Sequence, residues 1–288
     1  MRPFLSYLCK PLACCALTAS LLSPLTAATI IDANFNSGTF ADAGLVDYST
    51  LANPTLTAGI GVGGSTGLNF GTNGGSATAS MTILTTASFS MFGQFTVNAN
   101  GSTATRIDGS AMAFGWTKAS EAFRPFQGTV SGSSAVAITD TVMVGLARTA
   151  TGGFSLGFGN GATELVSRNL FGNSVTFGEL TANNWYRLEG TIQYNSSTGT
   201  FTFLDVSLDD FGTNGTTEVN ANLLYGTGGS LSVAGFGSTG RAIWANNLDR
   251  GVLSMDNYYL AAVPEPAAAL LLGVGGFAIL LRRRRSRV

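Results

Sequence analysis

The stretch WYRLEGTIQYNSSTGTFTFLDVSL, residues 185–208, decides the fold class. In its first ten residues, apolar side chains such as Tyr186, Leu188 and Ile192 alternate with polar and charged ones. A period of two is typical of a β-strand with one buried face. Residues 195–199 (NSSTG) are turn formers, and residues 200–208 (TFTFLDVSL) form a second strand-like run. The stretch therefore predicts an antiparallel β-hairpin.

The composition extends this prediction to most of the chain. Glycine supplies 38 of the 288 residues, and only 11% of residues are charged, against about 25% in an average domain. The hydrophobic share of 45% is nevertheless ample for a core. Further strand-like segments, bounded by Gly, Ser, Thr and Asn, are residues 30–35, 79–85, 90–98, 111–117, 141–149, 153–158, 230–236, 241–244 and 253–261. We expect residues 29–262 to form one all-β domain, a single two-sheet antiparallel β-sandwich.

Two segments of this domain carry a resemblance to a known fold family. The hairpin begins with Asn-Trp-Tyr-Arg-Leu at residues 184–188, and a final strand contains Met-Asp-Asn-Tyr-Tyr-Leu at residues 255–260. This pattern resembles the laminin-G or concanavalin A-like jelly roll. The resemblance implies that the sandwich is a concanavalin-like jelly roll.

The charges and the rare residue types exclude several functions. Residues 29–262 hold eight basic and fifteen acidic residues, a balance that disfavours nucleic acid as a partner. The chain has no histidine, so Ser-His-Asp and Cys-His catalysis and His-bearing metal sites are excluded. All three cysteines lie in the first fifteen residues.

The N-terminus has the features of a secretory signal peptide, residues 1–28. Arg2 and Lys10 supply positive charge, and residues 12–22 (LACCALTASLL) form a short apolar segment. Small residues at 26–28 (TAA) suit signal peptidase, and we expect cleavage after Ala28. The alternative is an uncleaved membrane anchor.

The C-terminus, residues 263–288, has three parts. Pro264, Glu265 and Pro266 are followed by the apolar residues 267–281 (AAALLLGVGGFAILL). As a helix this segment is about 22 Å long, short of a hydrocarbon core of about 30 Å. The arginines that follow would snorkel to the headgroups and keep the end of the chain on the cytoplasmic side. These membrane-stop residues are Arg282, Arg283, Arg284 and Arg285. The sequence predicts a transmembrane helix over 267–281.

This three-part tail resembles the PEP-CTERM sorting signal. The resemblance implies an exported protein that an exosortase processes, with Pro264, Glu265 and Pro266 as the recognition residues. The precursor would be anchored in the inner membrane, and the processed protein would reach the cell surface or the extracellular matrix. The alternative is an ordinary C-terminal anchor with an incidental pair of prolines.

Candidate binding residues are fewer. Asp205 and Asp209 share a strand face if the hairpin is regular, and they are candidate calcium ligands or a carboxylate pair; the alternative is solvated edge charges. Trp185 and Trp244 are candidates for stacking on sugar rings, and the alternative is a place in the core. The Asp256-Asn257 pair and the glycine-rich residues 59–64 are best explained as turn formers.

No catalytic constellation is evident, so we expect a structural or binding protein rather than an enzyme, without a required cofactor. Carboxylate pairs of glycoside hydrolases often lie on one strand with spacings such as Glu-x-Asp-x-Glu, which this chain lacks. A carbohydrate-binding module, with extracellular polysaccharide as its partner, and a secreted glycoside hydrolase are the alternative functions.

Overall fold

The computed structural model describes residues 27–36, 39, 41, 43–47, 55–69, 74–95, 110–118, 141–148, 154–160, 169–175, 180–246 and 252–264. Within these ranges, Thr29–Ala262 forms one compact unit. The expected transmembrane segment 267–281, Glu265, Pro266 and the four arginines lie outside the described residues, as does most of the expected signal peptide. No helix among the described residues has the length and apolar character of a membrane span.

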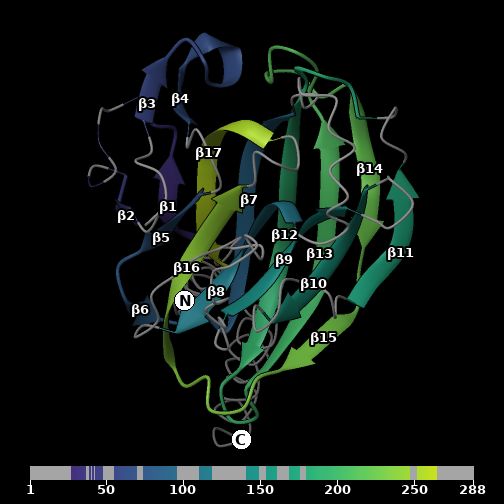
Figure 1. Cartoon of the computed structure of the whole chain (residues 1–288). Coiled ribbons are helices and arrows are strands. Elements are labelled where there is room, and N and C mark those ends of the chain that lie inside the picture. Colours follow the sequence, from purple (N-terminus) through teal and green to yellow (C-terminus); the bar gives the residue numbers. More distant parts are fainter. Residues whose placement is uncertain are drawn as a thin grey trace, which may run out of the picture. The chain divides into compact units, whose positions relative to one another are not determined.

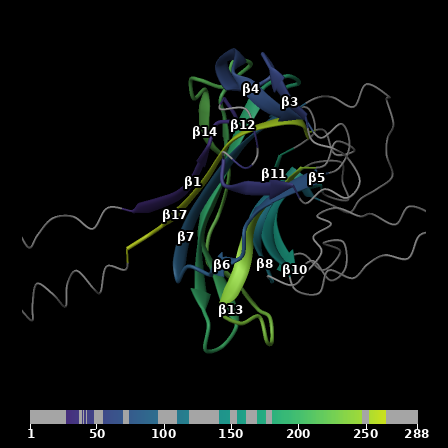
Figure 2. The ribbon, with the colours of Figure 1, turned by 90° about the vertical axis from the view of Figure 1, so that its left-hand side faces the viewer.

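The unit consists of two antiparallel sheets that face each other (Figure 1, Figure 2). In sheet A the strand order is β14-β13-β12-β7-β17-β4-β3, with β1 on β17 and β15 on β13. Its strands are β1 (Ala28–Ala33), β3 (Thr55–Ala58), β4 (Thr66–Asn69), β7 (Thr86–Phe95), β12 (Trp185–Asn195), β13 (Thr200–Asp210), β14 (Asn220–Gly226), β15 (Gly229–Ser232) and β17 (Val252–Ala262).

In sheet B the order is β11-β10-β9-β8-β16-β5-β2, with β6 on β16. Its strands are β2 (Leu45–Asp47), β5 (Gly74–Thr78), β6 (Met81–Thr82), β8 (Ser110–Lys118), β9 (Thr141–Arg148), β10 (Phe154–Asn160), β11 (Asn169–Val175) and β16 (Thr239–Asn246). This architecture confirms the predicted all-β, two-sheet antiparallel sandwich.

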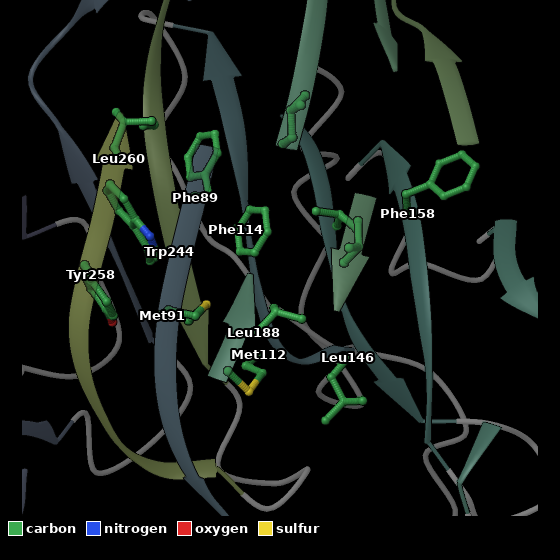
Figure 3. Close-up of a cluster of buried hydrophobic side chains, with 14 of the residues drawn as sticks. Phe89, Met91, Met112, Phe114, Leu146, Phe158, Leu188, Trp244, Tyr258 and Leu260 are labelled. Carbon is green, nitrogen blue, oxygen red and sulfur yellow. The ribbon is translucent and has the colours of Figure 1, made fainter. Parts of the chain in front are cut away.

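The core lies between the sheets and is rich in aromatic rings (Figure 3). Phe89 of sheet A stacks on Phe114 of sheet B, with ring centroids 5.1 Å apart. Trp244 of sheet B stacks on Tyr258 of sheet A at 5.2 Å. Alternate residues of β7 and β12 are buried, as a period of two requires. The inward residues of both sheets therefore form one continuous apolar layer.

The predicted hairpin is present as β12 and β13, with one irregularity. Thr191 pairs with Asp205, whereas the next residue, Ile192, pairs with Phe203. Leu204 is therefore an extra residue, a β-bulge, and its side chain is 40% exposed. Because the bulge precedes Asp205, Asp205 and Asp209 still fall on the same, outer face of sheet A.

Candidate functional site

The outer face of the hairpin carries a ladder of polar pairs. Arg187 lies opposite Asp209, Glu189 opposite Ser207, and Thr191 opposite Asp205. The even-numbered residues of β12 point into the core, so these odd-numbered residues face away from it. β7 lies on the other side of β12 and places Ser88 beside Thr191.

Arg187 sits at the centre of an ionic cluster. Its Nη2 lies 2.9 Å from Oδ2 of Asp209 and 3.6 Å from Oε2 of Glu218, and its Nε lies 3.1 Å from Oε2 of Glu189. The guanidinium carbon is 4.9 Å from the centroid of the Phe211 ring. Asp209 also accepts a hydrogen bond from the backbone N–H of Asn222, 2.7 Å from Oδ1. One cation thus holds three carboxylates in place.

A hollow of about 260 Å³ adjoins this cluster, and four neighbouring strands or their ends contribute to it. The polar groups that line it come from Ser88, Glu189, Thr191, Asp205, Ser207, Asn222 and Tyr225. Tyr225 is 44% exposed, and it pairs with Ser207 in the sheet, which places it on the same outer face. No basic side chain lines the hollow.

Glu189 has an altered acidity in this setting. Burial raises the pKa of the Glu189 carboxyl, Arg187 lowers it, and the carboxylates of Asp209, Asp205 and Glu218 raise it further. The net effect is a raised pKa of Glu189. Glu189 therefore holds its proton more tightly than an ordinary glutamate.

The hollow offers the chemistry that recognises polyols. Carboxylate and amide oxygens accept hydrogen bonds from hydroxyl groups, serine and threonine hydroxyls both donate and accept, and an exposed tyrosine supplies an apolar face. The lining holds the carboxylates of Glu189 and Asp205, and Arg187, which pairs with Glu189, lies outside it. The hollow therefore disfavours an anionic ligand.

The two tryptophans predicted to stack on a ligand are both in packed positions. Trp244 is 0% exposed, and its Nε1 donates a hydrogen bond to the Ser90 carbonyl at 3.2 Å. Trp185 is 2% exposed although it lies on the outer face of β12. Gly215 covers it so closely that a Cβ at Gly215 would lie 2.9 Å from Cγ of Trp185. The stacking prediction is corrected here, because neither ring is available to a ligand.

The two aspartates predicted as metal ligands have different surroundings. Asp205 lines the hollow, whereas Asp209 is 2% exposed and engaged by Arg187. Within the described ranges, no group of three or more acidic, cysteine or histidine side chains lies close enough together to hold a metal ion. Calcium binding stays a prediction from the sequence.

Asp256 lies within β17 and accepts one local hydrogen bond, from the backbone N–H of Asn257, but its main partners belong to the distant turn at residues 61–65. Its Oδ2 accepts hydrogen bonds from the backbone N–H of Val62 and from Oγ of Ser65, both at 2.8 Å. Gly63 and Gly64 in this turn have φ of 64° and 77°, and Asn257 has φ of 51°. The glycine-rich segment is therefore a tight turn, as predicted, and the structure adds that Asp256 fastens it to β17.

Sequence reasoning missed Asn222 and Tyr225. Both lie in β14, a strand that the sequence analysis did not predict. The apolar run Leu223-Leu224-Tyr225 was the available signal, but it is bounded by too few alternating residues to indicate which side faces solvent.

Comparisons with known proteins find two kinds of similarity. Residues 262–285 match the PEP-CTERM protein-sorting motif. No curated protein matches the chain. Among solved structures, the exoplasmic/lumenal domain of VIP36 in its Ca²⁺/mannose-bound form has 11% identity, covers 82% of this chain and 90% of its own, and has a TM-score of 0.45. The globular domain of T. cruzi calreticulin has 8% identity, covers 90% of this chain and 100% of its own, and has a TM-score of 0.39.

The match to the sorting motif confirms the resemblance found at the C-terminus. The motif implies an exported protein that an exosortase processes, with a membrane-anchored precursor. The two antiparallel sheets form the β-sandwich expected from the sequence.

Proposed function

We propose that the chain is a cell-surface or extracellular-matrix protein whose β-sandwich binds carbohydrate in the hollow on the outer face of sheet A. In this proposal a signal peptide directs export, a C-terminal transmembrane helix holds the precursor, and exosortase releases or transfers the domain. The domain is a binding module without catalytic activity.

The observation that carries the proposal is the composition of the hollow. Tyr225 is 44% exposed and lines the hollow together with Glu189, Asp205 and Asn222. A partly exposed aromatic ring next to several fixed polar groups is a typical arrangement for a ligand that has both apolar C–H faces and hydroxyl groups. Sugars have both.

The fixed ionic cluster supports the proposal as well. Arg187 holds Glu189 at 3.1 Å, and Asp209 holds the backbone of Asn222 at 2.7 Å. Both anchored residues line the hollow. Polar groups that are already oriented lose little conformational entropy when a ligand arrives, which favours binding.

A glycan array probed with the full-length chain, purified in a detergent without a sugar headgroup, tests the proposal. We expect binding to neutral or amino-sugar glycans and about tenfold weaker binding by Tyr225→Ala, in line with the loss of one aromatic contact. Val219→Ala is the matched control, because Val219 is 69% exposed and does not line this hollow. An array without any bound glycan, or equal loss in both variants, would contradict the proposal.

Glycoside hydrolysis is the second candidate, and one observation favours it. Glu189 and Asp205 are diagonal neighbours across the hairpin, a relation that places residues about 7–8 Å apart, and glycosidase carboxyl groups lie about 5–9.5 Å apart. The raised pKa of Glu189 would suit a general acid. We expect no release of reducing sugar from β-glucans. Release that Glu189→Gln and Asp205→Asn each abolish would replace the binding proposal with the enzymatic one.

A further inference from the structure

A second hollow, of about 510 Å³, lies at the tip of the same hairpin. Its lining comes from Thr85, Gln193, Tyr194, Asn195, Ser196, Thr198, Thr200 and Thr202. None of these side chains is charged at neutral pH. The polar groups of this surface are therefore hydroxyls and amides, which are matched to an uncharged polyol.

The hydroxyl groups at the tip are already aligned. Oγ1 of Thr200 lies 2.9 Å from Oγ of Ser232, and Thr198 donates a hydrogen bond to Oγ1 of Thr200 at 2.9 Å. Oδ1 of Asn195 accepts a hydrogen bond from the backbone N–H of Ser197 at 3.0 Å, which holds the turn in shape. The second hollow is thus a pre-ordered surface.

The two hollows follow one another along the same strands. Thr191 lines the first and Gln193 the second, and alternate residues of a strand lie on one face about 6.6 Å apart. On β13, Asp205 lines the first hollow and Thr202 the second. The path from Glu189 to Asn195 is six residues, about 20 Å of strand.

The bulge residue Leu204 stands between the hollows. It separates Thr202 from Asp205 in β13, and both Leu204 and Asp205 are exposed. The exposed Leu204 side chain is an apolar surface between two polar hollows. The C–H face of a sugar ring can pack against such a surface.

We propose that the two hollows are subsites of one groove, which binds a linear, uncharged polysaccharide laid along β12 and β13 over several sugar units. This inference rests on the carbohydrate-binding function proposed above and names its ligand class. A neutral chain fits the lining, because the carboxylates of Glu189 and Asp205 disfavour anionic glycans and no charged side chain lines the tip. Leu204 contacts the chain at the junction.

Isothermal titration of the full-length chain in sugar-free detergent tests this. The probes are linear oligosaccharides of two and six units from neutral β-1,4-glucan, β-1,3-glucan, mannan and xylan. We expect one series to bind, with the hexasaccharide at least about tenfold tighter than the disaccharide, or about 1.4 kcal/mol. The double variant Gln193→Ala/Thr202→Ala and the single variant Leu204→Ala should lose this advantage of length, so that the hexasaccharide binds no more than about twice as tightly as the disaccharide.

The outcomes separate the two proposals. If Tyr225→Ala weakens both lengths but the tip variants change neither, the first hollow binds sugar and the extended groove is wrong. If no series binds, the carbohydrate function is wrong together with the groove. Val219→Ala again serves as the control, and unchanged melting temperatures show that each variant is folded.

Discussion

Arg187 and Asp209 face each other across the hairpin, and their side chains form an ion pair with 2.9 Å between Nη2 and Oδ2. The side chain of Asp209 is only 3% exposed and that of Arg187 is 28% exposed. The pair is therefore largely withdrawn from water. Removing one partner of such a buried pair lowers the free energy of unfolding more than removing one partner of an exposed pair. It also connects the β12–β13 hairpin to Asn222 at the start of β14.

Arg187→Ala should lower the free energy of unfolding by about 3 kcal/mol, because it leaves the buried carboxylate of Asp209 without a cation. Glu218→Ala is the control at the rim of the same cluster. Glu218 is 42% exposed and 3.6 Å from Arg187, so its loss should cost less than about 1 kcal/mol. Urea denaturation measures both. If both variants lose the same free energy of unfolding, the buried Arg187–Asp209 pair does not stabilise the domain more than the exposed Glu218 contact does.

Asp256→Ala should destabilise the domain by about 3 kcal/mol, because the donors at Val62, Ser65 and Asn257 lose their acceptor. Ser65→Ala removes one of these donors and should cost about 1 kcal/mol. Chemical denaturation at pH 7 is the measurement. A smaller loss in Asp256→Ala than in Ser65→Ala would contradict the role of Asp256 as the fastener of this turn.

The stability contributed by Asp256 should depend on pH. Burial raises the pKa of Asp256 above its ordinary value of 3.8, against the effect of its hydrogen bonds to Ser65, Val62 and Asn257. The folded state therefore binds this proton more tightly than the unfolded chain, and the stabilisation is lost as pH rises from 3.8 through the raised pKa. The stability advantage of wild type over Asp256→Asn should shrink over this range. A constant difference between pH 3.5 and pH 8 would refute the raised pKa.

Gly61→Ala should be more damaging than Gly59→Ala, for a reason of space. A Cβ at Gly61 would lie 2.3 Å from Oγ of Ser65 and 2.6 Å from Oδ2 of Asp256, so the fastened turn would have to shift. Gly59 has nothing within 4 Å of such a Cβ, although its φ of 83° strains any other residue by about 1–2 kcal/mol. Melting temperatures of the two variants compare them, and a lower one for Gly59→Ala would contradict the steric reason.

Processing should remove both ends in a host that carries an exosortase. We expect Thr29 as the new N-terminus and a C-terminal cut near Pro264, within the matched sorting motif 262–285. Intact-mass spectrometry of the surface form measures both cuts. The variant Glu265→Ala should keep the arginine-rich end. If the wild-type surface form also keeps its arginine-rich end, the sorting proposal is wrong.

The sequence predicted the strands that have a strong period of two and missed those that do not. The hairpin is present within one or two residues of its expected ends, and 90–98 is observed as Thr86–Phe95. Strand β5 has the sequence GGSAT, without apolar alternation. It is a strand because it pairs with β16, which the local sequence does not indicate. The expected strand 79–85 is reduced to Met81–Thr82.

The candidate site was predictable only in part. Asp205 was found because it stands on a clearly alternating strand. Tyr225 was not, because its place beside Ser207 depends on the pairing of β14 with β13, which local sequence does not encode. The burial of Trp185 likewise depends on the approach of Gly215, thirty residues further along the chain.

The last strand of the domain, β17, occupies an interior position in sheet A, between β7 and β4. Its residues pair with β7 from Val252 to Ala262. Because β7 is synthesised more than 150 residues earlier, its edge toward β17 stays unpaired until β17 has been made. A ribosome or translocation channel must therefore deliver nearly the whole polypeptide before the sheet can close. Maturation of the domain is consequently a late event, timed by the arrival of the strand that directly precedes the sorting motif.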